Sequence, residues 1–279
     1  MLHTMYLFAA GVSLTEIWKE RKRFFIEMDL SVQLPVQRYL YVVLPLEDYG
    51  HHDPAKLLTE APMPSVEQIG PMKFTWYYSQ KAVFASIHGM HHDTLKFALA
   101  MGSAGIGPFT PLDMRVCALL CVGVSTVAVV REAKKNQTGD GPRIGRAERR
   151  RYLKKVREYL NQLQNLSKSA TDLCLGKAYL VEAELMSVSK RPKDQERCPS
   201  LYRVAISLSA KTENLLDEAF ASEIAANFML RHHEQYQREQ GLSYLEDAVT
   251  LYRRWGATAK VRQLEDRLLR ATSSQAKAD

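Results

Sequence analysis

The chain has 279 residues, of which 46% are hydrophobic and 25% are charged, with a net charge of +7 and a pI of about 9.1. This balance is ordinary for a folded globular protein and excludes an intrinsically disordered chain. Glycine and proline are few and fall between runs of helical periodicity, which favours an all-α fold.

The cysteines and the N-terminus indicate the cellular setting. Cys117 and Cys121 lie one helical turn apart in an apolar run, and the chain has no C-x-x-C pair. We therefore expect buried thiols, with Cys174 and Cys198 also outside any disulfide framework, and a reducing, cytoplasmic location. The opening MLHTMYLFAAGVS has no basic residue before its apolar run, so we do not expect a signal peptide.

The first helix is predicted from Ser13 and Glu16, which form the S-x-x-E pattern of a capping box. Helical spacing then continues over residues 13–30. The residues expected on its apolar face are Ile17, Phe24 and Met28.

Two His-His-Asp triplets, at 51–53 and 91–93, follow glycines and lie 40 positions apart (91 − 51). Each Asp is expected to cap the next helix, giving helix–turn–helix units with exposed imidazoles. The unit over 74–101 would bury Leu95, Ala98 and Leu99 or their neighbours. A zinc site needs three or four converging ligands, so we expect no metal at these triplets or at His232-His233-Glu234.

Residues 116–130, VCALLCVGVSTVAVV, carry no charge. A membrane-spanning helix needs about 20 such residues, so we predict a buried helix at about 112–134 rather than a membrane span. The glycine-rich segments 102–111 and 136–145 on either side of it are expected to be loops, the second one flexible.

A basic helix is predicted at about 146–167, with its charges opposite an apolar stripe. One interpretation is a solvated helix face; the alternative is a patch that binds nucleic acid or an anionic surface through residues 143–157. The residues of this candidate patch are Arg146, Arg149, Arg150, Arg151, Lys154, Lys155 and Arg157.

The stretch 219–268 predicts three amphipathic helices. Ala221, Ile224, Ala225 and Phe228 have the spacing of one buried face. Gly241 is expected to open the second helix and Gly256 to end it, because glycine readily adopts a left-handed cap conformation. The apolar residues expected on the second and third helices are Leu245, Ala248, Tyr252, Trp255, Ala257, Val261, Leu264 and Leu268.

The same pattern occurs one unit earlier, because a shift of 43 positions (226 − 183) superposes apolar residues of 175–208 on those of 218–251. Periods of about 20–50 residues indicate helical solenoids. The period exceeds that of a standard tetratricopeptide unit, and we attribute the excess to a long polar loop at 189–200.

These patterns predict an all-α, helical-hairpin repeat solenoid, a tetratricopeptide-like superhelix. Residues 1–135 would form N-terminal hairpins, 136–145 a flexible loop, 146–270 the C-terminal repeats and 271–279 a disordered tail. The expected repeat signature is Ala183, Ala205, Ala226, Ala248, Tyr252, Trp255, Gly256, Ala257, Val261 and Leu264.

The motifs of catalysis are missing from the sequence. There is no G-x-x-x-x-G-K-[ST] phosphate loop, nucleophile elbow or kinase catalytic loop, and GSAGIG at 102–107 lacks a strand before it. Glu182 and Glu184 are two apart on a helix and cannot share acid–base work. We therefore predict no catalytic residue, no cofactor and no metal.

Four segments carry a family likeness: 177–186, 201–210, 218–230 and 244–265. The last has Tyr252, Trp255, Gly256, Ala257, Ala259, Lys260, Val261 and Leu264 in the family's arrangement. The chain resembles the tetratricopeptide-like helical region of large signalling proteins that carry a kinase-like domain, an AAA-type (STAND-like) ATPase domain and a histidine kinase.

The resemblance implies a non-catalytic scaffold or regulatory module of signal transduction, acting through protein partners or neighbouring signalling domains. The ATPase, kinase and sensor domains are not in these residues, so the sequence is expected to be a fragment or relative of such a protein and not an enzyme. The alternative is nucleic-acid or anionic-surface binding through helix 143–157.

Overall fold

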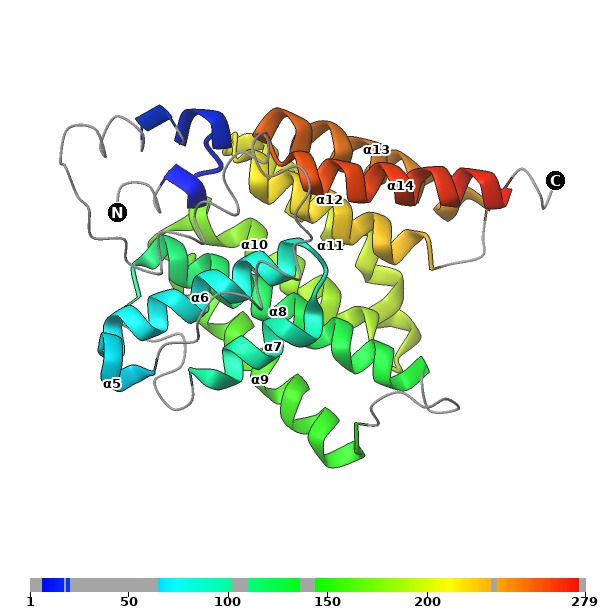
Figure 1. Cartoon of the computed structure of the whole chain (residues 1–279). Helices are drawn as coiled ribbons and strands as arrows, with labels where there is room; N and C mark the ends of the chain where they lie inside the picture. The colour runs from blue at the N-terminus through cyan, green and yellow to red at the C-terminus, as the bar shows by residue number, and fades with distance from the viewer. Residues whose placement is uncertain are drawn as a thin grey trace. The chain divides into compact units, whose positions relative to one another are not determined.

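The computed structural model describes residues 7–17, 19–20, 65–101, 110–135, 144–231 and 235–275. Regular structure in this part of the chain is helical throughout (Figure 1), which confirms the all-α prediction. The helices from residue 65 onward are α5 (Val66–Ile69), α6 (Pro71–Ile87), α7 (His91–Ala100), α8 (Leu112–Lys135), α9 (Arg146–Leu166), α10 (Thr171–Ser187), α11 (Pro192–Lys211), α12 (Leu215–Met229), α13 (Gln235–Trp255) and α14 (Thr258–Gln275).

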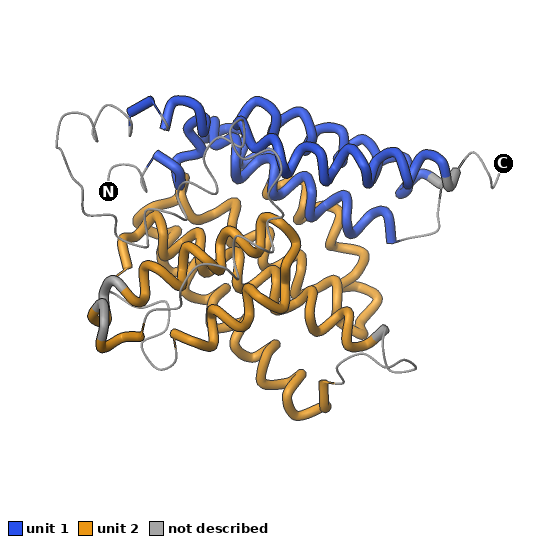
Figure 2. Tube along the Cα trace, viewed as in Figure 1, with its two compact units in different colours: residues 1–57, 206–279 blue, residues 58–205 orange. Residues whose placement is uncertain are grey.

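The chain divides into two compact units (Figure 2). Unit 1 combines residues 1–57 with 206–279, and unit 2 contains residues 58–205, so the division falls within α11. The division at 135 and 146 stays a prediction; in the described part of unit 1, residues 7–17 pack with the helices that follow residue 206.

The core of unit 2 is α8, which packs against α6, α7, α9 and α10. Residues 116–130 are buried throughout, as expected for the predicted buried helix. Gly123 lies where α8 packs against α10, and a Cβ there would be in ordinary van der Waals contact, 3.4 Å, with both methyl groups of Val181. Among the described helices, only residues 112–134 are long and apolar enough to cross a membrane, and 89% of the most apolar window is buried. A buried core helix of a soluble protein has the same composition.

The α6–α7 hairpin turns at Gly89, whose φ of +74° favours glycine. Asp93 does not cap α7 as predicted, because the helix already begins at His91 and Asp93 lies inside its first turn. The helix buries Thr94 and Phe97, whereas Leu99 is 60% exposed. The predicted hairpin is correct, but the buried face is rotated by about one residue. His51, His52 and the segment expected to be helical after them lie outside the described residues.

In unit 1, residues 7–17 pack against the helices near the C-terminus. The rings of Phe8 and Trp255 meet edge to face at 5.4 Å, and Trp255 Nε1 donates to the carbonyl of Val12 at 3.0 Å. The predicted capping box is present, because the Glu16 amide donates to Ser13 Oγ at 3.3 Å. Ile17 is fully buried as predicted. Phe24 and Met28 lie outside the described residues.

The helices α12, α13 and α14 form the rest of unit 1, with α13 packed against both others. Gly256, at φ +92°, separates α13 from α14 as predicted. Gly241 does not open α13, which begins at Gln235; it lies within the helix where α12 comes closest. A Cβ at Gly241 would lie 2.9 Å from Leu230 Cγ and 3.0 Å from Met229 Cβ. The glycine therefore serves close packing, not helix initiation.

Two further expectations are wrong. The polar segment 189–200 is not a long loop, because α11 begins at Pro192 and continues through Pro199. Its polar residues are solvent-facing positions of a helix. The tail expected to be disordered from residue 271 is helical as far as Gln275, since α14 continues beyond Leu269.

Candidate functional site

The predicted basic helix is α9, in unit 2. It extends from Arg146 to Leu166, close to the predicted bounds, and its buried stripe of Val156 and Leu163 faces the unit's core. A helix turns about 100° per residue, so the charged positions can be assigned to rows along its surface. Exposed positions of the predicted patch are Arg146, Arg150, Arg151, Lys154, Lys155 and Arg157, and Arg149 is half-buried.

One row of α9 carries paired charges. Arg151 lies 3.7 Å from the Glu148 carboxylate, and Lys155 lies 3.0 Å from that of Glu158. The Tyr152 hydroxyl also donates to Glu148, at 2.8 Å. Both cations lie near aromatic rings, with Lys155 Nζ at 5.6 Å from the ring centre of Tyr159. Local acids thus neutralise this row.

A second row holds cations alone. Arg146, Arg150, Lys154 and Arg157 are separated by four, four and three positions. They fall within an arc of about 80° and span roughly 16 Å along the axis. None of them has a carboxylate within salt-bridge distance in the described part of the chain. We call these residues the unpaired row.

The opposite face of α9 is committed to packing. Val156 and Leu163 are fully buried, and Val156 lies near Gly123. Burial raises the pKa of Tyr159 to about 12, assisted by the neighbouring Glu158 charge. The apolar stripe therefore holds the helix in unit 2, and the cations are what α9 offers to solvent.

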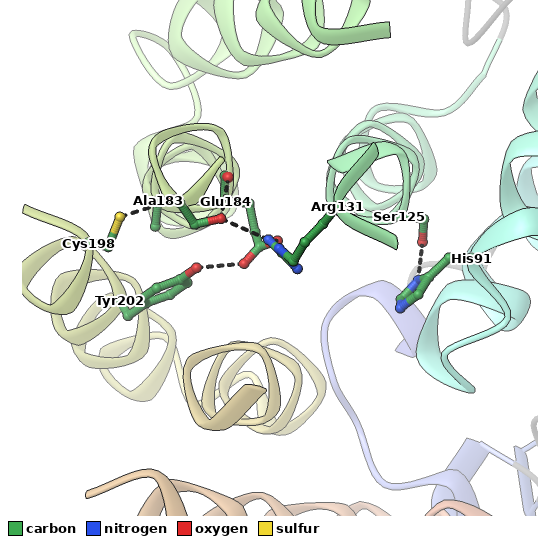
Figure 3. Close-up of polar contacts among 8 residues, drawn as sticks. His91, Ser125, Arg131, Ala183, Glu184, Cys198 and Tyr202 are labelled. Carbon is green, nitrogen blue, oxygen red and sulfur yellow. Dashed lines mark hydrogen bonds and ion pairs between the residues drawn. The ribbon is translucent and has the colours of Figure 1, made fainter. Parts of the chain in front are cut away.

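A buried polar cluster centres on Glu184 of α10 (Figure 3). Its carboxylate accepts from Arg131 of α8 at 2.6 Å and from the Tyr202 hydroxyl of α11 at 2.5 Å. Burial alone would lower the pKa of Arg131, but the ion pair with Glu184 outweighs it and raises that pKa. Glu184 is 2% exposed, so the cluster ties three helices together and offers solvent no reactive group.

Unit 1 contains a second cluster of the same kind. Glu223 of α12 accepts from Lys260 of α14 at 2.7 Å and from the Tyr252 hydroxyl of α13 at 3.0 Å. Burial lowers the pKa of Lys260, and the ion pair with Glu223 opposes this shift. Each cluster thus joins a glutamate on one helix, a tyrosine on the next and a cation from a third.

A histidine and two serines form a chain of hydrogen bonds between α6, α7 and α8. Ser86 Oγ donates to the carbonyl of Cys121 at 3.2 Å, and Ser125 Oγ donates to Ser86 Oγ at 2.9 Å. His91 Nδ1 lies 3.1 Å from Ser125 Oγ (Figure 3) and completes the chain. Ser125 is fully buried, so its hydroxyl is not open to solvent.

The two histidines of the triplet at 91–93 contact different partners. His91 bonds to Ser125, whereas His92 faces Glu132 at 3.2 Å, so adjacent imidazoles have different partners. No group of three potential metal ligands occurs among the described residues. His232 to Glu234 lie outside them. The four cysteines are buried and form no disulfide, as predicted, and the Cys198 thiol lies 3.6 Å from the carbonyl oxygen of Ala183 (Figure 3).

The predicted repeat signature maps onto buried positions. Ala183, Ala205, Ala226 and Ala248 are inaccessible to solvent, and Gly256 alone among the ten residues is only half-buried. The aromatic members have polar roles that the pattern did not reveal, because Tyr252 bonds to Glu223 and Trp255 bonds to Val12.

Sequence reasoning missed Lys81 on α6. Its side chain is fully buried, and Nζ lies 5.1 Å from the ring centres of both Tyr77 and Phe97. Burial lowers its pKa to about 8, with the nearby Lys96 charge contributing. The sequence FTWYYSQKAVF places this lysine close to several aromatic residues. That pattern alone does not distinguish a buried lysine from one whose ammonium group extends to solvent.

No protein-family model, curated protein or solved structure matches this chain. The resemblance to helical regions of signalling proteins therefore rests on its sequence segments.

Proposed function

We propose that the chain is a non-catalytic helical-repeat module of the tetratricopeptide-like kind. It would act as a scaffold or regulatory part of a signal-transduction protein, through contacts with protein partners or neighbouring domains. The observation that carries this proposal is the burial pattern of two helical hairpins, α10–α11 and α12–α13, which the 43-residue shift superposes.

Half of the equivalent positions of the two hairpins are buried in both copies. Ala178 matches Ala221 and Val181 matches Ile224, and all four are buried. The signature alanines pair in the same way. The remaining superposed pairs are buried in the second copy and half-buried in the first; these are Leu185/Phe228, Met186/Met229, Ile206/Val249 and Leu208/Leu251.

The order of contacts in unit 2 also supports a stack. From α6 to α10, each helix packs against the next, and α6 and α8 also pack against the next but one. Repeat proteins bury their cores through such nearest-neighbour contacts and present the remaining helix faces to partners. The buried clusters around Glu184 and Glu223 tie helices together in each unit, which fits a module that works by its surface.

Site-specific photo-crosslinking tests this proposal. A benzophenone amino acid at Tyr236, which is 72% exposed on α13, would be introduced into the full chain in its native cells. We expect a discrete protein adduct, whose purified partner binds the wild-type chain directly. The control places the same group at fully buried Tyr77, which should give no adduct. Adducts absent from every exposed helix position, or ATP hydrolysis that tracks the intact fold, would contradict the proposal.

A second candidate function is polyanion binding through helix 143–157. The unpaired row of α9 favours it, because four exposed cations without carboxylate partners concentrate positive potential on one face. Binding to a polyanion through this row must weaken steeply with salt. A flat salt response would exclude it.

A further inference from the structure

The unpaired row does not end with α9. Arg149, between the row and the buried stripe, donates from its guanidinium to the carbonyl oxygen of Val188 at 3.4 Å. Val188 is the C-cap of α10. The connection that follows carries Lys190 and Arg191, and the first turn of α11 carries Lys193; all three are exposed. The fold therefore brings two basic segments together that are about forty positions apart in sequence.

On the helical wheel of α9, Arg149 lies nearer on average to the unpaired row than to the paired cations. It is about 60° to 140° from the four members of the unpaired row, with Arg146 the nearest, and about 120° and 160° from Lys155 and Arg151. The turn is also well ordered internally, because Ser189 Oγ donates to the Asp194 carboxylate at 2.6 Å and the Arg191 amide donates to Ser189 Oγ at 3.2 Å. Asp194 is thus engaged within the turn.

We propose that the unpaired row of α9 and the α10–α11 turn form one surface that binds the phosphate backbone of a nucleic-acid double helix. This inference rests on the second candidate function and deepens it. Its ligand-facing residues are Arg146, Arg150, Lys154, Arg157, Lys190, Arg191 and Lys193.

The residues of this surface fit a nucleic acid better than an acidic protein or a membrane. Protein interfaces have an apolar core depleted in charge, whereas nucleic-acid interfaces are polar and strongly positive. A membrane-surface helix must insert its apolar face, but Val156 and Leu163 are fully buried in unit 2.

Single strands bind by stacking bases on exposed aromatic rings. Tyr152 and Tyr159 are only half-exposed, and Arg151 and Lys155 lie against them. A surface of lysine and arginine donors without such platforms suits the regular phosphates of a duplex, read without base specificity.

The chain offers three matched double variants, each removing one arginine and one lysine. Arg150→Gln with Lys154→Gln alters the unpaired row, Arg191→Gln with Lys193→Gln alters the turn, and Arg151→Gln with Lys155→Gln alters the paired row. Binding of the full chain to 20-base-pair DNA and RNA duplexes would be measured by fluorescence anisotropy from 50 to 200 mM salt. Circular dichroism confirms that each variant is folded.

For the wild-type chain, about seven phosphate contacts predict a fall in affinity of roughly 10³-fold or more over this salt range. The row and turn variants should each weaken binding by about tenfold or more at 50 mM salt and reduce the slope of log K against log salt by about two. The paired-row variant should remain within about threefold of the wild-type chain.

The outcomes separate the two proposals. If the row variant loses binding but the turn variant matches the paired-row control, the composite surface is wrong and the α9 candidate stands. If the row variant itself matches the control, both are wrong. Tighter binding to single strands, acidic peptides or anionic vesicles than to duplexes would overturn the assignment of the partner.

Discussion

Glu223 and Lys260 form an ion pair almost entirely shielded from water, with side chains only 7% and 2% exposed and Nζ 2.7 Å from Oε1. The Tyr252 hydroxyl bonds to the other carboxylate oxygen at 3.0 Å. The pair links α12 to α14, so it fixes how the last helix of unit 1 packs. Its energetic importance depends on both partners being present, because desolvating one charge without the other is costly.

We therefore expect Lys260→Met to destabilise the protein by about 3–5 kcal/mol, since it leaves Glu223 buried without a cation. Adding Glu223→Gln should recover most of the loss, because a neutral amide can still accept from Tyr252. Urea denaturation followed by circular dichroism measures both values. Equal destabilisation by the single and double variants would show that lost packing, not the unpaired charge, dominates.

Lys81 gives a prediction for pH dependence. Its pKa is lowered from 10.5 to about 8, so the folded state binds fewer protons than the unfolded state between these values. Stability from this residue should thus rise with pH from about 8 to 10.5, by at most about 3 kcal/mol. Lys81→Met carries no charge and should be more stable than the wild-type chain below pH 8.

The difference between Lys81→Met and the wild-type chain should shrink as the pH rises from 8 to 10. Comparing the two chains cancels the similar downward shift of Lys260 and the raised pKa values of Tyr78 and Tyr159, which both share. A difference that stays constant over this range, measured by urea denaturation, would mean that the pKa of Lys81 is not lowered in the folded state.

Gly241→Ala tests the close contact between α12 and α13. Alanine in a helix interior normally adds about 1 kcal/mol of stability over glycine. At this position the new Cβ would lie within about 3 Å of Met229 and Leu230, and overpacking of this kind costs about 1–3 kcal/mol. We expect a net loss in thermal denaturation. A more stable variant would show that the two helices can separate without cost.

Asn214 joins the first residues of unit 1 to its helices. Its Oδ1 accepts from the Asp217 amide at 3.0 Å, capping α12, and its Nδ2 donates to the carbonyl of Ala9 at 2.7 Å. Asn214→Ala should cost about 2 kcal/mol, roughly one for each bond. Asn214→Asp keeps the cap acceptor but loses the donor, so it should cost less in urea denaturation. Equal losses would make the contact with Ala9 the dominant one.

The sequence predicted those features that depend on local pattern. Apolar spacing identified α8 and α9, and the chemistry of Gly256 placed the break between α13 and α14. The predictions of a helix start at Gly241 and a loop at 189–200 are wrong. Both rested on composition, whereas the packing of neighbouring helices determines the structure there. Polarity alone does not distinguish a loop from a solvent-facing helix such as the start of α11.

The candidate site likewise has features that the sequence predicts and features that depend on tertiary contacts. The basic residues of α9 were evident from composition, and their division into a paired and an unpaired row follows from helical geometry once Glu148 and Glu158 are placed. The contribution of the α10–α11 turn could not be predicted, because only the tertiary contact between Arg149 and Val188 brings it beside α9. The partners of Glu184 and Glu223 likewise come from helices distant in sequence.

We propose that the interior ion pairs hold the fold while the unpaired row binds a nucleic-acid duplex. Thermal denaturation with and without a DNA duplex at 50 mM salt tests it most directly, because a ligand that binds only the folded state raises the melting temperature. We predict that the duplex stabilises the wild-type chain and the Arg151→Gln/Lys155→Gln variant by several degrees, and Arg150→Gln/Lys154→Gln much less. Equal stabilisation of all three, or none in the wild-type chain, would contradict it.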